Sequence, residues 1–256
     1  MAGRSAAALL GPKADVPVAS GPATQKTGDQ DPPGRGLCTE FGDYWIVPDD
    51  TVQCYDVEGE QITESDFAAL EADWNTVKDN SGTIQITDTD SSGNAHAGFC
   101  ASILAKIGML MSQPSGRQLI RNLLQGGQQV TIRPSVGMIR GGATTSGQSM
   151  SVLENLDGTS GGGGGSIIEV DPNVSDTDIK VYDAAGNEIS DPVFIFLGHE
   201  LIHAQHNQAG HNKNRHSVAL EEQQTISGGN GISENDLRAE HGLTARHGHA
   251  GRDVRP

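Results

Sequence analysis

Apolar residues recur at spacings of three and four in three stretches of the chain, which predicts amphipathic helices there. The first stretch covers 65–79 and begins with Ser-Asp, a pair typical of helix N-termini. The second covers 96–111, and the third runs from 115 to the glycine pair 126–127. The apolar positions that define these three faces are Phe67, Leu70, Trp74 and Val77; Phe99, Ile103, Ile107 and Met111; and Leu119, Ile120, Leu123 and Leu124.

Short runs rich in β-branched and aromatic residues predict strands between and after these helices. They cover 44–47, part of 51–63, 83–87, 128–133, 166–170 and 179–182. The pattern predicts an α+β domain with a mixed or antiparallel sheet. The segment 135–165 is rich in Gly, Ser and Thr and ends in five glycines, which predicts a flexible loop.

Residues 1–36 show neither a helical nor a strand period. Their richness in Ala, Gly, Pro, Ser, Thr and Gln predicts a disordered leader. We expect one folded domain over 37–256, with about the last eight residues disordered as in other polar chain ends. The apolar run at 6–10 is too short for the core of a secretory signal peptide, which takes about 7–15 residues. Export by the general secretory route is therefore not indicated.

Charge and cysteine content narrow the classes of partner. A net charge of -16 argues against binding to nucleic-acid phosphates. Three cysteines without a C-x-x-C pair argue against a disulfide framework and favour a reducing working compartment. No stretch approaches the roughly 18 apolar residues that a membrane helix needs, so we expect no membrane partner.

The strongest chemical signal is the sequence H-E-L-I-H at 199–203, which follows an apolar run at 193–197. Residues four apart share one face of a helix, so His199 and His203 can direct their imidazoles to one point. Neutral imidazole is a preferred zinc ligand. Glu200 lies about 100° around the helix from His199, within reach of a metal-bound water, and is the candidate general base.

A third ligand must come from elsewhere in the chain. His206 follows on roughly the same face, but three ligands on one straight helix splay too far to share a tetrahedral ion. The better candidates are Glu221 and Glu222, on a second predicted helix over 218–225, because a carboxylate completes the His, His, Glu set of thermolysin-like peptidases. One carboxylate can bind zinc while the other orients a ligand histidine, and spacing does not decide which.

The motif order from residue 192 to 246 resembles the NleD-like zinc metallopeptidases, type III secretion effectors of bacterial pathogens and symbionts. The residues that carry this resemblance are H-E-L-I-H-A-x-H, then E-E-x-x-T, then E-N-x-x-R at 234–238, then an arginine after G-L. The same order appears, more distantly, in clostridial neurotoxin light chains. The resemblance implies a zincin-like fold with H-E-x-x-H on the active-site helix.

The resemblance also implies a role for each matching residue. His199, His203 and Glu222 would bind zinc, Glu221 would lie behind a ligand, and Glu200 would be the base. Arg246 matches an arginine that stabilises the tetrahedral intermediate, whereas the companion tyrosine is replaced here by His249. Arg238 and Glu234 are equally readable as an ordinary i,i+4 helix pair. We expect the remaining histidines to be surface residues: His206, His211, His216, His241 and His247.

These patterns predict a zinc endopeptidase with one Zn²⁺ per chain, a monomer secreted by a type III system that cleaves a host protein in the host cytoplasm. An extended substrate would pair with an exposed strand edge, for which 128–133 and 167–170 are the candidates. Two other functions fit the same motif. One is a non-catalytic zinc-stabilised protein that sequesters a host partner, and the other is metal storage by the histidine-rich end.

Overall fold

The computed structural model describes residues 43–46, 52–55, 64–135, 143–229 and 231–248. The predicted leader over 1–36, the predicted start of the domain at residue 37 and the predicted disordered end lie outside these ranges. The first described strands, β1 (Asp43–Ile46) and β2 (Val52–Tyr55), form an antiparallel pair, as the pattern near 44–63 predicts.

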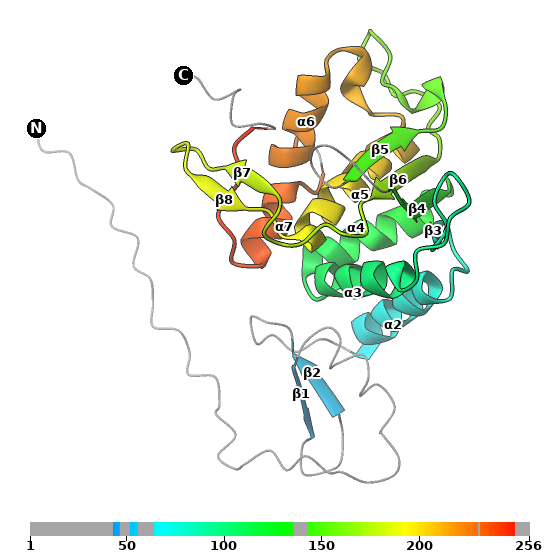
Figure 1. Ribbon diagram of the computed structural model, residues 1–256, viewed down its shortest axis with the longest axis vertical. Helices are drawn as coiled ribbons and strands as arrows, with labels where there is room; N and C mark the ends of the chain where they lie inside the picture. Colours follow the sequence, from blue (N-terminus) through cyan, green and yellow to red (C-terminus); the bar gives the residue numbers. More distant parts are fainter. Residues whose placement is uncertain (1–42, 47–51, 56–63, 136–142, 230, 249–256) are drawn as a thin grey trace, which may run out of the picture.

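A four-stranded mixed sheet forms the centre of the domain, in the order β3-β4-β6-β5 (Figure 1). Strands β3 (Ile84–Ile86), β4 (Val130–Pro134) and β6 (Ser166–Val170) are parallel, and β5 (Ala143–Gly147) runs antiparallel to β6. Alternate residues of β4 and β6 are buried, as expected for strands with one face on a core. The predicted α+β class with a mixed sheet is confirmed.

The two strands proposed from sequence as a substrate edge are both interior strands. β4 lies between β3 and β6, and β6 lies between β4 and β5, so neither has a free edge. The strand that pairs with β6 at the edge of the sheet is β5. It lies within residues 135–165, whose Gly/Ser/Thr content predicted a loop. Only Ala143 of β5 is buried, so this strand lacks the apolar alternation that reveals a strand in a sequence.

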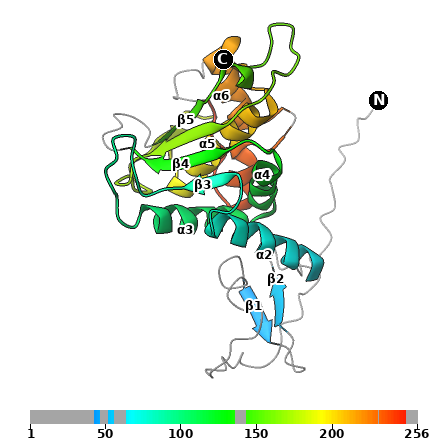
Figure 2. The same ribbon diagram turned by 90° about the vertical axis from the view of Figure 1, so that its right-hand side faces the viewer.

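Three helices pack against one another beside the sheet: α3 (Phe99–Met111), α4 (Pro114–Gln125) and α5 (Val193–Ala209). Figures 1 and 2 show α5 passing next to β5 and β6, and α2 (Glu64–Lys78) lying against α3 and α4. Their shared core consists of fully or almost fully buried side chains: Ile103, Ile107, Leu110, Leu119, Leu123, Ile195, Leu201 and Ile202. The three helices predicted from apolar spacing correspond to α2, α3 and α4, and this prediction is confirmed.

The glycine run at 161–165 is packed, which makes the prediction of a flexible loop wrong at this end. The amide of Gly161 donates to the carbonyl of Gly210, and the amide of Gly164 donates to that of Asn207. Gly163 has φ +70°, and a Cβ there would lie 2.1 Å from the carbonyl oxygen of Gln208. The backbone approaches the last turn of α5 more closely than a residue with a side chain would allow.

The rest of the domain is built from short elements near the C-terminal end of the chain. Strands β7 (Lys180–Tyr182) and β8 (Glu188–Ser190) form a hairpin, and two 3-10 turns, η1 (Met150–Val152) and η2 (Lys213–Arg215), lie on either side of α5 in the sequence. Helices α6 (Val218–Ser227) and α7 (Glu234–Glu240) follow. Among the described residues, no helix has both the length and the apolar content needed to cross a membrane.

Candidate metal centre

Helix α5 carries the H-E-x-x-H motif in its middle. The apolar run at 193–197 forms the first turns of this helix and does not precede it, and the Asp176 carboxylate accepts a 2.8 Å hydrogen bond from the amide of Val193 at its start. The helix ends at Gly210, whose φ of +69° suits a left-handed C-terminal residue. Because His199 and His203 are four apart, their Nε2 atoms lie on one side of the helix, 3.0 Å from each other.

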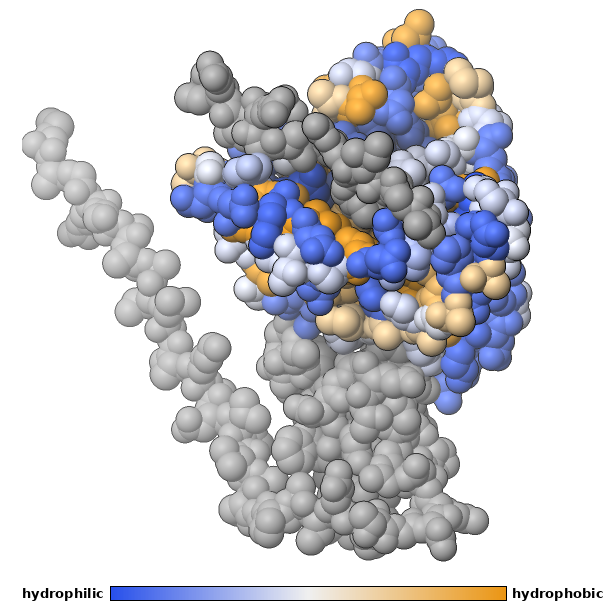
Figure 3. Space-filling view, viewed as in Figure 1, coloured by the Kyte–Doolittle hydropathy of each residue, from blue (hydrophilic) through white to orange (hydrophobic). Residues whose placement is uncertain are grey.

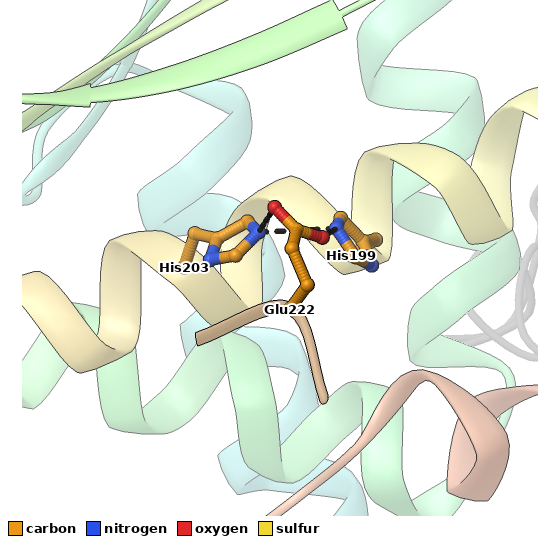
Figure 4. Close-up of side chains that lie close together, drawn as sticks. All are labelled: His199, His203 and Glu222. Carbon is orange, nitrogen blue, oxygen red and sulfur yellow. Dashed lines mark hydrogen bonds and ion pairs between the residues drawn. The ribbon is translucent and has the colours of Figure 1, made fainter. Parts of the chain in front are cut away.

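Glu222 reaches both histidines from the neighbouring helix. Ser217 Oγ accepts the amide of Ala219 and starts α6, which then places Glu222 opposite the pair. Its Oε2 lies 3.2 Å from His199 Nε2, and its Oε1 lies 3.4 Å from His203 Nε2 (Figure 4). The two imidazoles and the carboxylate therefore converge on one point from two helices.

The spacing of these three groups fits a tetrahedral metal ion. A tetrahedron with bonds of about 2.0–2.1 Å to its ligands has edges of about 3.3 Å. The separations of 3.0, 3.2 and 3.4 Å lie close to that value. Three protein ligands of this kind leave a fourth position for water or substrate, which is the arrangement of a catalytic site.

Each of these two histidines has a second carboxylate on its other ring nitrogen. His199 Nδ1 lies 2.8 Å from Glu234 Oε2, and His203 Nδ1 lies 2.9 Å from Glu221 Oε1. The Thr225 hydroxyl also lies 3.2 Å from His203 Nδ1. Both outer carboxylates are fully buried. Such partners fix the ring orientation and make the imidazole a stronger ligand.

Glu234 belongs to a buried cluster of four charges behind His199. Arg246 Nη1 donates a 2.7 Å hydrogen bond to Glu234 Oε2, and Arg238 Nη1 lies 3.4 Å from Glu234 Oε1. Arg238 Nη1 also donates to Asp191 Oδ1 at 2.7 Å. All four residues are at most 5% exposed. Two arginines thus offset the burial of two carboxylates, which would otherwise be costly.

Hydrogen bonding sets the protonation of the centre in the metal-free chain. Burial lowers the pKa of His203, but its hydrogen bonds to Glu221 and Glu222 outweigh burial and raise that pKa to about 10. Burial raises the pKa of Glu221, but bonds from His203 and His206 lower it to about 2. These hydrogen bonds therefore favour the protonated form of His203 in the metal-free chain, and its Nε2 faces the point on which the three groups converge.

Glu200 directly follows His199 in the middle of α5, and its exposed fraction is 6%. Its carboxylate is close enough to His203 for its charge to raise the pKa of that imidazole. The carbonyl of Glu200 accepts a 3.0 Å hydrogen bond from the Thr145 hydroxyl. The edge strand β5 is thus joined to the helix at the residue predicted to be the base.

The structure brings together five of the six site residues predicted from sequence. His199, His203 and Glu222 form one group of ligand-type atoms, and Glu200 lies beside them. Arg246 lies behind His199 and contacts Glu234. His249 lies outside the described residues.

The sequence did not reveal the roles of four residues near the centre. Asp191 received no role, and Arg238 and Glu234 were equally readable as an ordinary i,i+4 helix pair; that pair is present at 3.4 Å, and all three residues are almost fully buried. His206 is a partner of Glu221 at 2.8 Å, and its side chain is 13% exposed, so the prediction of a surface residue is wrong for it. His211, His216 and His247 are exposed, in agreement with that prediction. The E-N-x-x-R motif was the available signal for Glu234 and Arg238.

Comparison with known proteins identifies a family that includes the segment that forms this centre. The model of the peptidase M91 family, described as effector proteins, matches residues 87–248. The match spans α3 to α7 and so includes every helix that contributes to the centre. No curated protein matches the chain. The match confirms the resemblance to NleD-like effector metallopeptidases and the zincin-like fold: the chain belongs to the peptidase M91 family of effector proteins.

Proposed function

We propose that the protein is a zinc-dependent endopeptidase that acts as an effector by hydrolysing a peptide bond in a host protein. One observation carries the proposal: the Nε2 atoms of His199 and His203 and the carboxylate of Glu222 converge with the spacing of a tetrahedral site. Membership of an effector peptidase family supports the same conclusion.

Zinc is the metal that this ligand set favours. Two imidazoles and one carboxylate are the ligands of thermolysin-like zinc sites, whereas magnesium and calcium prefer oxygen ligands alone. We propose one ion per chain, held by His199, His203 and Glu222, because the second group of ligand-type atoms shares His203 with the first. When bound, zinc supplies a Lewis acid that polarises a carbonyl and lowers the pKa of water.

Glu200 is the proposed general base and acid. It would take a proton from the attacking water and later deliver it to the leaving amine. Its position on the turn between the two histidines keeps its carboxylate next to the ligands, and its burial limits competing water. The bond from Thr145 to the Glu200 carbonyl supports this turn of the helix.

Arg246 was predicted from the resemblance to stabilise the oxyanion. The contact of its Nη1 with Glu234 favours a positioning role, in which the guanidinium holds the carboxylate that orients His199. Direct stabilisation of the oxyanion by Arg246 and His249 stays a prediction.

We propose β5 as the strand that binds the substrate backbone. It is the edge strand of the sheet next to α5, and its residues Thr144, Ser146 and Gly147 are exposed. An extended host segment could add to this edge through main-chain hydrogen bonds. Small side chains on β5 would leave room for a substrate with larger ones.

The proposed setting is the host cytoplasm, reached through a type III system. The family description as effector proteins supports secretion, and the composition of residues 1–36 suits an unfolded export signal. Few cysteines suit a reducing compartment. We propose that the working form is a monomer.

The test compares the zinc-loaded protein with Glu200→Gln in host lysate, using profiling of new N-termini. Glu188→Gln is the matched control, because Glu188 is an exposed glutamate on β8. We expect new N-termini with the wild type and with the control, and a loss of at least 100-fold in cleavage with Glu200→Gln, the scale of a general-base contribution. Glu200→Gln should still bind one zinc.

Two outcomes would contradict the proposal. One is a wild type that binds zinc but creates no new N-termini in any host lysate. The other is a Glu200→Gln variant that keeps the biological effect, which would indicate a zinc-stabilised binding protein.

A further inference from the structure

Glu221 is held by three donors, two histidines of α5 and one backbone amide after that helix. Its Oε1 lies 2.9 Å from His203 Nδ1 and 2.8 Å from His206 Nδ1, and its Oε2 accepts a 2.7 Å hydrogen bond from the amide of Lys213. The carboxylate is fully buried. A buried carboxylate with this many donors has one stable orientation, because any rotation leaves donors unsatisfied.

His206 occupies a defined place between two partners. Its Nδ1 faces the Glu221 carboxylate, and its Nε2 lies 3.5 Å from the side-chain nitrogen of Gln224. A carboxylate can only accept from Nδ1, and an amide nitrogen can only donate to Nε2. Because a carboxylate oxygen can only accept, His206 Nδ1–H is the donor to Glu221 Oε1.

We propose that His206 is a positioning residue for His203: by donating to Glu221 Oε1 it holds this carboxylate against His203 Nδ1 and so strengthens His203 as a metal ligand. The proposal rests on the metal centre of the proposed function. It assigns the second group of neighbouring ligand-type atoms, formed by His203, His206 and Glu221, to support of the centre and not to a second ion.

The two ligand histidines are supported by different means. Behind His199, Glu234 is held by the guanidinium groups of Arg246 and Arg238, which carry a permanent charge. Behind His203, Glu221 is held by an imidazole and a backbone amide. His206 is therefore the side chain behind Glu221 that can be replaced while the carboxylate keeps the Lys213 amide and His203 as partners.

The test is the affinity of the full chain for Zn²⁺ alone, measured by competition with a chelating dye. His206→Leu replaces the imidazole by an apolar side chain of similar size that cannot donate a hydrogen bond. His206→Asn retains a donor, because the amide nitrogen of Asn takes the place of Nδ1. His211→Leu is the control, since His211 is exposed and follows α5.

We expect His206→Leu to weaken Zn²⁺ binding about tenfold, the lower end of the effect of removing an outer-shell partner. The Zn²⁺ affinity of His206→Asn should lie within a few-fold of that of the wild type. The Zn²⁺ affinity of the control His211→Leu should be unchanged. Metal-to-chain ratios should remain one in all four proteins.

The proposal is overturned if His206→Leu binds Zn²⁺ like the wild type, or if His206→Asn binds as weakly as His206→Leu. The second result would mean that shape, and not the donated hydrogen bond, matters at this position. A metal-to-chain ratio that falls from two to one in His206→Leu would instead make His206 a ligand. Failure of the proposed function is a separate result, because it concerns cleavage, whereas these measurements require only metal binding.

Discussion

Glu221 and Glu222 are adjacent in the sequence, yet their carboxylates contact opposite sides of the histidines of the candidate metal centre. Glu222 lies on the Nε2 side of both rings, and Glu221 lies on the Nδ1 side of His203 alone. Successive residues on a helix differ by about 100° in direction, so the two neighbouring carboxylates can face different sides of the same imidazole ring. The spacing of the motif left the choice of ligand open, and the side that each carboxylate faces favours Glu222.

This difference predicts unequal effects of the same substitution. Glu221→Gln keeps an oxygen acceptor for His203 and should weaken Zn²⁺ binding by about 10–100-fold, as for other outer-shell partners. Glu222→Gln removes the anionic ligand itself and should weaken binding by more than that range. Isothermal titration of the metal-free variants would measure this, with Glu188→Gln as an unaffected control. Equal losses, or a larger loss for Glu221→Gln, would reverse the assignment.

Among the elements, α5 depends on a close approach of its last turn to the glycine run. Gly158 and Gly163 form a matched pair for testing this contact, because both have positive φ, +81° and +70°. A Cβ on Gly158 would meet no atom within 4 Å, whereas one on Gly163 would lie 2.1 Å from the Gln208 carbonyl oxygen. The two substitutions by Ala share the conformational cost and differ in the steric cost.

We therefore expect Gly163→Ala to lower the free energy of unfolding by about 1–3 kcal/mol more than Gly158→Ala, the usual cost of overpacking. Chemical denaturation of both variants would measure the difference. Equal destabilisation would show that the glycine run can move away from α5 without cost.

The same elements show why some structure could be predicted from the sequence and some could not. Helices α3 and α4 have long apolar stripes, such as Phe99, Ile103 and Ile107. Their helical periodicity can be recognised in the sequence without knowledge of the neighbouring elements. β5 reads A-T-T-S-G and has one buried residue, so nothing in its sequence distinguishes it from a loop. The contacts of Asp191 with Arg238 and of His206 with Glu221 join separate segments, and no local pattern encodes them.

At the scale of the whole molecule, the described residues on the face in Figure 3 are mostly polar, in keeping with the net charge of -16. The most exposed large apolar side chains include Met150, Leu156, Val218 and Leu220, from η1, the segment after it and the start of α6. Figure 3 shows separate hydrophobic patches at the end of the molecule where α6 lies. Polar residues lie between these patches in that view.

The stability of the metal-free molecule should have an optimum in mildly acidic solution. The pKa of His203 is raised from 6.5 to about 10, so its contribution is complete below 6.5 and is lost as the pH rises towards 10. The pKa of Glu221 is lowered from 4.5 to about 2, so its contribution is complete above 4.5 and is lost as the pH falls towards 2. Both contributions come from one hydrogen-bonded pair, so its contribution to stability is greatest between about pH 4.5 and 6.5.

Thermal unfolding of the chelator-treated protein across pH 3–10 would test this window. We expect the melting temperature to fall on both sides of it, and the fall at high pH to disappear when zinc replaces the His203 proton. A metal-free protein that is most stable at pH 9 would contradict the assigned protonation of His203.

All the groups of the centre come from one continuous stretch of chain, from Asp191 in front of α5 to Arg246 behind α7. Only η2 and its flanking residues separate α5 from α6, so His203 and Glu222 are joined by a short loop. The entropy lost in closing a loop rises with the logarithm of its length, so this closure costs little. A chain that has been unfolded should therefore bring His203 and Glu222 together at a lower entropic cost than Asp191 and Arg238, which are 47 residues apart.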